Sequence, residues 1–197
     1  MSEVKVIPRS YFLHDKVTEI AEDLLGKVLC TYIDEKVCKG VIIETEAYSG
    51  YNDKACHAYN GKRTSRTEIF FKQGGLAYVY LCYGIHYLFN VITNSEEIGD
   101  AVLIRALEPI TGADFMFNRI GKIDKRICSG PGKLTKALGI SGNHNGLEIP
   151  SNGIWFEDHS REINNIEHSK RIGVDYAGED ALKLWRFSIK NHPLVSK

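Results

Sequence analysis

The sequence predicts an α+β fold, in which flanking helices cover a curved, mostly antiparallel sheet with one protruding β-hairpin. The chain has 197 residues, of which 43% are hydrophobic. That is the size of a single domain, residues 1–197, with enough apolar side chains for a core. Strand-like runs outnumber helical ones and often follow one another directly, which favours antiparallel pairing.

The first predicted elements are a helix and a hairpin. Asp15 is a favourable N-cap for a helix whose apolar residues recur on one face, and Gly26 is a natural stop. The β-rich runs 27–33 and 37–45 are predicted to form a hairpin. The polar, Gly-rich segment 49–75 is expected to be loop with short turns.

The rest of the chain alternates between strands and two further helices. The second of these helices lies between Ser129 and Gly139, residues suited to its two ends. The predicted elements are strands 76–83 and 85–93 around Gly84, strand 102–107, helices 112–120 and 131–138, and short strands 154–156 and 185–189.

Composition narrows the class of protein. No apolar run approaches the roughly 20 residues that span a bilayer, and the first ten residues lack a signal-peptide core. We therefore expect an intracellular protein, cytoplasmic in a bacterium or nuclear in a eukaryote. The five cysteines are scattered without a CxxC pair, which predicts buried free thiols and no metal site.

The charges do not by themselves indicate nucleic-acid binding. The net charge is zero, whereas a DNA-binding protein usually carries a basic excess. Basic residues are nevertheless clustered along the chain, so one face could be basic and another acidic. The clusters are Lys62, Arg63, Arg66 and Lys72; Lys122, Lys125 and Arg126; Lys133 and Lys136; and Lys170 and Arg171.

Glu44 and Glu46 lie near the end of a predicted strand. Period-2 alternation places them on the same face. Two neighbouring carboxylates can perturb each other's pKa, which suits one of them to act as a general base. A pair of solvated glutamates at a strand end is the alternative interpretation.

A predicted hairpin around Gly84 is rich in tyrosine. Tyr78 and Tyr80 share one face, and Tyr83 lies at the sharpest point. Aromatic side chains on a protruding hairpin suit stacking on bases or wedging between them. A tyrosine-rich sheet packed on a core is the alternative, because aromatic residues favour strands.

Three further features carry candidate chemistry. His57 follows the glutamate pair, although a lone histidine is more often structural. Arg105 lies in an apolar strand and needs a partner such as Glu46, unless its head reaches solvent. The run from Ser129 to Lys133 opens a helix whose N–H groups could bind a phosphate, but it lacks P-loop spacing.

Taken together, these segments resemble the alkyladenine (3-methyladenine, or methylpurine) DNA glycosylase family. The resemblance covers nearly the whole chain in family order, but 143–167 match poorly. The matching blocks are Leu24-Leu25-Gly26-Lys27-Val28-Leu29; Glu44-Thr45-Glu46-Ala47-Tyr48; His57 with Gly61-Lys62-Arg63-Thr64; Ala77-Tyr78-Val79-Tyr80-Leu81-Cys82-Tyr83-Gly84; Asn90; Leu103-Ile104-Arg105-Ala106-Leu107-Glu108-Pro109; Cys128-Ser129-Gly130-Pro131-Gly132-Lys133-Leu134; and Arg171-Ile172-Gly173-Val174 through Trp185-Arg186-Phe187.

The resemblance implies a role for each matching residue. Glu46 matches the residue that acts as general base for the attacking water. Arg105 matches a residue that helps to hold this water and the carboxylate of the general base. Tyr83 matches the side chain that fills the space left by the flipped nucleotide. The residues implied to surround the flipped base are Tyr48, His57, Tyr80, Asn90 and, by a weaker match, Ile154; those expected on the DNA backbone are Arg63, Lys133 and Arg171.

The resemblance thus implies a monomeric base-excision-repair enzyme acting on double-stranded DNA that contains damaged purines. The implied reaction is hydrolysis to an abasic site without strand cleavage, with no cofactor or metal. The implied substrates are 3-methyladenine and 7-methylguanine, extending to ethenoadenine or hypoxanthine. A non-catalytic damaged-DNA-binding protein and a glycoside hydrolase using Glu44 and Glu46 are the alternatives.

Overall fold

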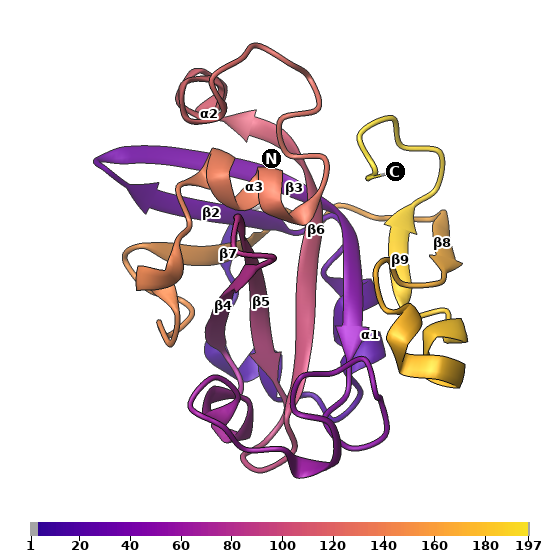
Figure 1. Cartoon of the computed structure of the whole chain (residues 1–197). Helices are drawn as coiled ribbons and strands as arrows, with labels where there is room; N and C mark the ends of the chain where they lie inside the picture. The colour runs from indigo at the N-terminus through magenta and orange to yellow at the C-terminus, as the bar shows by residue number, and fades with distance from the viewer. Residues whose placement is uncertain (1–3, 197) are drawn as a thin grey trace.

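A computed structural model describes residues 4–196 and confirms the α+β class, with a curved antiparallel sheet at its centre (Figure 1). The sheet order is β1-β7-β2-β3-β6-β5-β4, and β9 pairs with both β3 and β8. The strands are β1 (Lys5–Val6), β2 (Val28–Ile33), β3 (Lys36–Tyr48), β4 (Leu76–Cys82), β5 (His86–Thr93), β6 (Asp100–Thr111), β7 (Ile154–Asp158), β8 (Ile166–Ser169) and β9 (Arg186–Ile189).

The helices are short and lie around the sheet. Their apolar faces explain their positions, since α1 buries Val17 and Ile20 and α3 buries Leu134 and Leu138. The helices are α1 (Val17–Asp23), α2 (Ala113–Ile120) and α3 (Pro131–Leu138), and the 3₁₀ segments are η1 (Arg9–Leu13), η2 (Tyr59–Gly61), η3 (Glu68–Phe71), η4 (Gly142–His144) and η5 (Asp175–Leu182).

The structure corrects the prediction at several boundaries. Asp15 does not cap α1: Lys16 occupies the N-cap position, and no side chain bonds to the helix end. The strand predicted over 37–45 extends to Tyr48, and that over 102–107 spans Asp100–Thr111. β1 and β8 were not predicted, because strands of only two and four residues are too short to show a periodic pattern.

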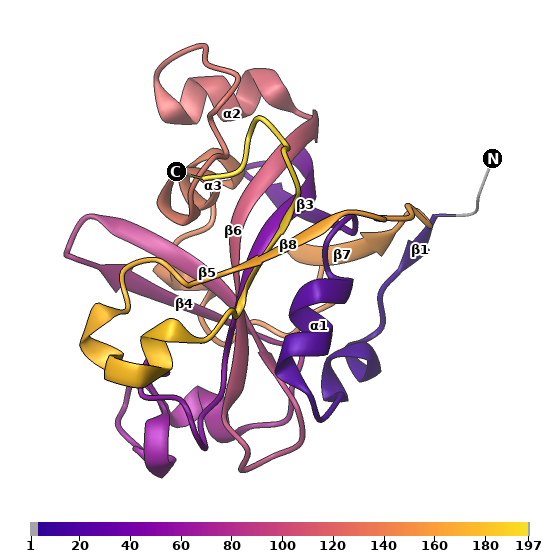
Figure 2. The same cartoon turned by 90° about the vertical axis from the view of Figure 1, so that its right-hand side faces the viewer.

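β4 and β5 form the expected protruding hairpin (Figure 2). Its turn is a tight one, in which the N–H of Ile85 donates to the carbonyl of Cys82 at 3.1 Å. Tyr83 and Gly84 at the centre both have positive φ, 50° and 73°. Positive φ at both central residues is typical of a type I′ turn, and strand pairing resumes at Cys82 and His86, so the loop has three residues. Tyr83 therefore projects from the tip with 89% of its surface exposed.

Two adjacent irregularities interrupt the pairing of β3 with β6. Ile42 faces Leu107 and Glu44 faces Ala106, so β3 carries one extra residue, Ile43, between them. Thr45 then faces Ile104, so β6 carries the extra residue Arg105. Each bulge switches which face of the sheet the following side chains occupy. Beyond the bulges, Glu44, Glu46 and Tyr48 share the face opposite to Ala47, which lies in the main core.

Candidate active site

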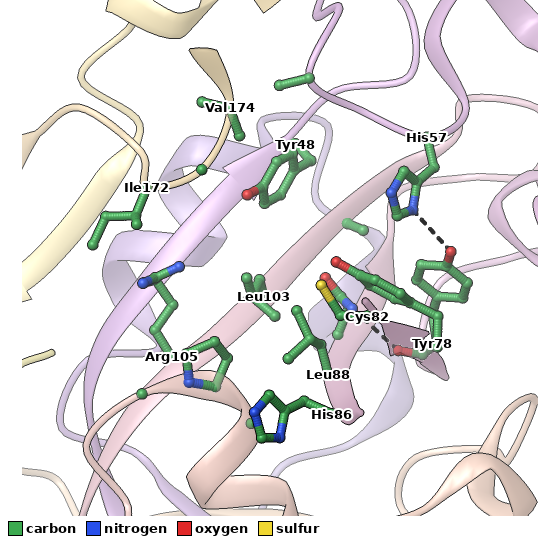
Figure 3. A pocket seen from close by; sticks show the side chains of 18 of the residues that line it. Tyr48, His57, Tyr78, Cys82, His86, Leu88, Leu103, Arg105, Ile172 and Val174 are labelled. Carbon is green, nitrogen blue, oxygen red and sulfur yellow. Dashed lines mark hydrogen bonds between the residues drawn. The ribbon is translucent and has the colours of Figure 1, made fainter. Parts of the chain in front are cut away.

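An aromatic pocket opens between the β4–β5 hairpin, β3, β6 and the segment that precedes η5. Its cavity of about 450 Å³ is within the range of small-molecule sites. Figure 3 shows Tyr48 and Arg105 on one side, His57 and Tyr78 on the other, and Leu103 and Leu88 between them. The aromatic residues that line it are Tyr48, His57, Phe70, Tyr78, Tyr80, Tyr83, His86 and Tyr176.

Glu46 lies directly behind the wall of this pocket. Its side chain is fully buried, and its carboxylate contacts three residues that line the cavity. The Tyr48 hydroxyl donates to Oε2 at 2.7 Å, the Ile172 N–H donates to Oε1 at 2.8 Å, and Arg105 Nη1 lies 3.2 Å from Oε2. Burial, and then the charge of Glu46, raise the pKa of Tyr48, so its hydroxyl keeps the proton that it donates.

Arg105 joins the two predicted glutamates into one buried cluster. Its Nε donates to Glu44 at 2.9 Å while Nη1 faces Glu46. Burial alone would lower the pKa of Arg105, but Glu46 and Glu44 raise it above its ordinary value, so the guanidinium stays charged. The prediction that a carboxylate partners Arg105 is confirmed. Both glutamates are buried, so the interpretation as solvated strand-end residues is wrong.

His57 is held neutral on the opposite side of the pocket. Arg66 Nε donates to the Tyr78 hydroxyl at 3.0 Å, which leaves the hydroxyl proton for His57 Nδ1 at 2.9 Å. Burial, and then the charges of Arg66 and Lys62, lower the pKa of His57 to about 4. We therefore assign the tautomer with the proton on Nε2. Arg66 also lies over the Tyr80 ring, 4.6 Å from its centroid.

The remaining predicted pocket residues fall in two groups. Tyr80 lines the cavity, and so does Asn90, whose side-chain amide donates to the carbonyl of Tyr78 at 3.2 Å. Ile154 does not line it. Ile154 is a fully buried core residue of β7, paired in register with Thr31. The prediction for Ile154 was wrong because its segment joins the sheet far from the pocket face.

The three predicted backbone-contact residues differ in their surroundings. Lys133 lines the pocket mouth at the start of α3. Arg63 lies on the surface, ion-paired with Glu68 and Glu97. Arg171 is not a surface residue at all, so the prediction that it binds a DNA phosphate is corrected: its side chain is fully buried.

Arg171 instead anchors the wall of the pocket. Its guanidinium forms a bidentate ion pair with Asp53 and donates to the carbonyls of Ala47 and Asp180. It also packs on the rings of Tyr48 and Trp185. A cation held by so many partners has a structural role, which is to hold the segment from Ile172 onward against the glutamate cluster.

Sequence reasoning missed several residues that complete the site. Ile172 donates its backbone N–H to Glu46, a contact for which no side-chain signal exists. The sequence places Arg66 in a basic cluster, but it does not indicate that Arg66 lies beside His57. Ser196, whose N–H and hydroxyl both donate to Glu44, is separated from Glu44 by 152 positions, and only the fold brings them together.

Neither a membrane span nor a metal cluster is found among residues 4–196. No helix there is long and apolar enough to cross a bilayer. No group of three or more His, Cys, Asp or Glu side chains in the same range could hold a metal ion. The five cysteines are free thiols, and burial raises the pKa of Cys128 to about 12.

The curved sheet carries an aromatic pocket, with a buried carboxylate behind its wall and an aromatic hairpin tip beside its mouth. Together with the comparisons with known proteins, this arrangement identifies a DNA glycosylase. Residues 11–193 match the family model described as Methylpurine-DNA glycosylase (MPG). The chain therefore belongs to the methylpurine-DNA glycosylase family, and it is an enzyme of base-excision repair.

Curated relatives agree over almost their whole lengths. A protein of Chlamydia felis is 44% identical over 92% of this chain and 95% of its own. Proteins of Clostridium novyi and Methanocella arvoryzae are 41% and 46% identical, each over 98% of this chain, and over 100% and 96% of their own lengths. All three carry the name "Putative 3-methyladenine DNA glycosylase".

Proposed function

We propose that the protein hydrolyses the N-glycosidic bond of alkylated purines flipped out of double-stranded DNA, leaving an abasic site, and that Glu46 activates the attacking water. The observation that carries this proposal is the burial of the Glu46 carboxylate directly behind an aromatic pocket, in contact with Arg105. The relatives' names support 3-methyladenine as one substrate.

Base recognition follows from the aromatic walls. Tyr48 and Tyr80 line the cavity, where a flipped purine would stack against their rings, and His57 is neutral. A cationic alkylated purine gains on the order of 1–2 kcal/mol from such faces when desolvated. It is also a good leaving group, so a base for water is sufficient. Ethenoadenine and hypoxanthine are neutral and would need proton donation as well.

Water activation follows from the glutamate cluster. The Glu46 carboxylate is oriented by Tyr48, Ile172 and Arg105, all of which also face the cavity. A water bound at this wall would give its proton to Glu46 and attack the sugar carbon from which the base departs. The carboxylate also stabilises the positive charge that develops on the sugar.

DNA binding is assigned to the surface around the pocket mouth. Tyr83 fills the space left by the flipped nucleotide, which offsets part of the cost of about a few kcal/mol for flipping. Lys133, beside the N-terminus of α3, contacts a phosphate, and Arg63 reaches the backbone farther out. The protein acts as a monomer inside the cell, on its DNA.

The decisive experiment is a base-release assay. Duplexes carrying 3-methyladenine, 7-methylguanine, ethenoadenine or hypoxanthine are incubated with the wild type, with Glu46→Gln and with the control Glu148→Gln. Glu148 is an exposed residue paired with Arg9, away from the pocket. We expect release of the two cationic bases by the wild type and the control, and a fall of at least about a hundredfold in Glu46→Gln.

Each alternative gives a different result. A non-catalytic damage-binding protein would bind the alkylated duplex but release no base from any substrate. A glycoside hydrolase would cleave simple glycosides, but Glu44 and Glu46 share Arg105 rather than facing each other across a cleft. Release by Glu46→Gln at the wild-type rate would refute the proposed mechanism.

A further inference from the structure

The segment 192–196 is part of the buried network behind the pocket. It follows β9 and runs back beside β3 and β6 toward α3 (Figure 2). Arg126 Nη2 donates to the carbonyl of Val195 at 2.9 Å, and Arg186 Nη2 donates to the carbonyl of Ser196 at 3.0 Å. Two arginines thus hold the backbone of this segment in place.

Ser196 bridges the central ion pair of the cluster. Its N–H donates to Glu44 Oε2 and its hydroxyl to Glu44 Oε1, both at 2.8 Å. Arg105 Nη2 in turn donates to the same hydroxyl at 3.3 Å. Glu44 is fully buried and Ser196 is 9% exposed, so water cannot easily replace either contact.

The contacts of Arg105 lead from Ser196 to Glu46. Nε is held by Glu44 and Nη2 by Ser196, and Nη1 then faces Glu46 at 3.2 Å. Because a guanidinium is planar and rigid, holding two of its nitrogens determines the position of the third. We propose that Ser196 is a positioning residue of the catalytic site, which acts on Glu46 through Glu44 and Arg105. The inference rests on the role proposed above for Glu46.

The charge state of Glu44 supports this role. Burial alone would raise the pKa of Glu44, but Arg105, the Ser196 N–H and Arg186 lower it below its ordinary value. Glu44 therefore remains a carboxylate that anchors Arg105. Without the Ser196 hydroxyl, Oε1 loses one donor and a buried N–H of Arg105 loses its acceptor. The guanidinium would then turn to find another partner, and its contact with Glu46 would change.

The test uses Ser196→Ala, Ser196→Thr and the control Leu194→Ala. Leu194 lies in the same segment, and its side chain makes none of the hydrogen bonds that hold Ser196. Base release is measured in a single turnover with excess enzyme on a 7-methylguanine duplex. Affinity is measured separately on a duplex with a stable abasic-site analogue. We expect Ser196→Ala to slow release roughly ten- to a hundredfold with affinity changed less than about twofold. Ser196→Thr should recover most of the rate, and Leu194→Ala should match the wild type.

The outcomes separate this inference from the proposed function. An unchanged rate in Ser196→Ala, with release abolished in Glu46→Gln, would overturn the positioning role alone. An equal fall in Leu194→Ala, or no recovery with threonine, would also overturn it, because the segment would then act only by packing. Wild-type release by Glu46→Gln would instead refute the general-base assignment itself.

Discussion

Glu46 and His57 illustrate how individual residues obtain their properties from their neighbours. Glu46 is a buried carboxylate that accepts from Tyr48 and from the Ile172 N–H. His57 is a base kept neutral by burial and by the nearby charge of Arg66. A cationic purine in the pocket would meet the wall backed by Glu46 on one side, and the neutral imidazole of His57 with Arg66 beside it on the other.

The depressed pKa of His57 predicts a pH dependence of stability. In the unfolded chain His57 binds a proton below its ordinary pKa of 6.5, whereas in the folded protein it does so only below about 4. Between these values the unfolded state holds more protons, so the free energy of unfolding should fall as the pH drops from 6.5 toward 4. His57→Gln should lose less stability over this window in urea titrations at each pH.

A second variant tests the cause of that shift. Arg66→Gln removes one of the charges that lower the pKa of His57, so its loss of stability over the same window should be smaller than in the wild type. The comparison is made within each variant, as the change between pH 6.5 and pH 4. Identical slopes in all three proteins would contradict the assignment to His57.

At the scale of elements, the β4–β5 hairpin combines a strained turn with an exposed aromatic tip. Tyr83 has φ 50°, a conformation that costs most L-residues roughly 1–2 kcal/mol but that Asn tolerates. Its side chain is 89% exposed and so contributes little to the core. The turn thus favours Asn on stability grounds, and we attribute the presence of tyrosine to base flipping.

Tyr83→Asn should accordingly separate stability from function. We expect a melting temperature equal to or above that of the wild type, together with slower base release from duplex DNA. Release from a single-stranded substrate should be unaffected, because no stacked gap has to be filled there. Thermal unfolding and release assays on both substrates measure these quantities. Unchanged release from the duplex would exclude a wedge role for Tyr83.

At the scale of the whole molecule, the zero net charge does not show which positive side chains are buried in ion pairs and which lie on the surface. Arg105 and Arg171 neutralise buried carboxylates, whereas Lys133 lies at the pocket mouth. The overall charge is therefore a poor guide to DNA binding, because buried pairs cancel within the fold. What matters for phosphate contacts is which cations remain on the face that bears the pocket.

Two variants distinguish an arginine that pairs with a buried carboxylate from a lysine that contacts DNA. Arg171→Gln leaves Asp53 buried without its partner, so we expect a loss of about 3–5 kcal/mol in the free energy of unfolding. Lys133→Gln should keep stability within about 0.5 kcal/mol. It should also weaken DNA binding and reduce the slope of log affinity against log salt by about 1.

The control is Lys5→Gln on β1, which lies on the other side of the molecule from the β4–β5 hairpin (Figure 2). It should change neither stability nor the salt slope. Chemical denaturation and fluorescence titrations at several salt concentrations provide both readouts. A fall in the salt slope for Lys5→Gln as large as that for Lys133→Gln would contradict the placement of the DNA-binding face.

Much of this molecule follows from local sequence. Strand-like runs on both sides of Gly84 predicted the hairpin, and Gly139 ends α3 as expected, although Gly130 rather than Ser129 occupies its N-cap position. The grouping of Glu44 with Glu46 on one face followed from strand periodicity, and the need of Arg105 for a partner followed from the cost of burying a charge. These inferences succeeded because each depends on residues only a few positions apart, or on a general energetic requirement.

Other features were decided only by the tertiary structure. Periodicity could not say which face of β3 the two glutamates occupy, because the bulge at Ile43 switches that face. Nor could it reveal that Arg171 is buried on Asp53, or that Ser196 reaches Glu44. The sequence by itself determined the fold class, the protruding hairpin and the residue types of the candidate site. The contacts of Glu46 with Arg105 and with Ile172, the latter 126 positions away, join segments that only the folded chain brings together.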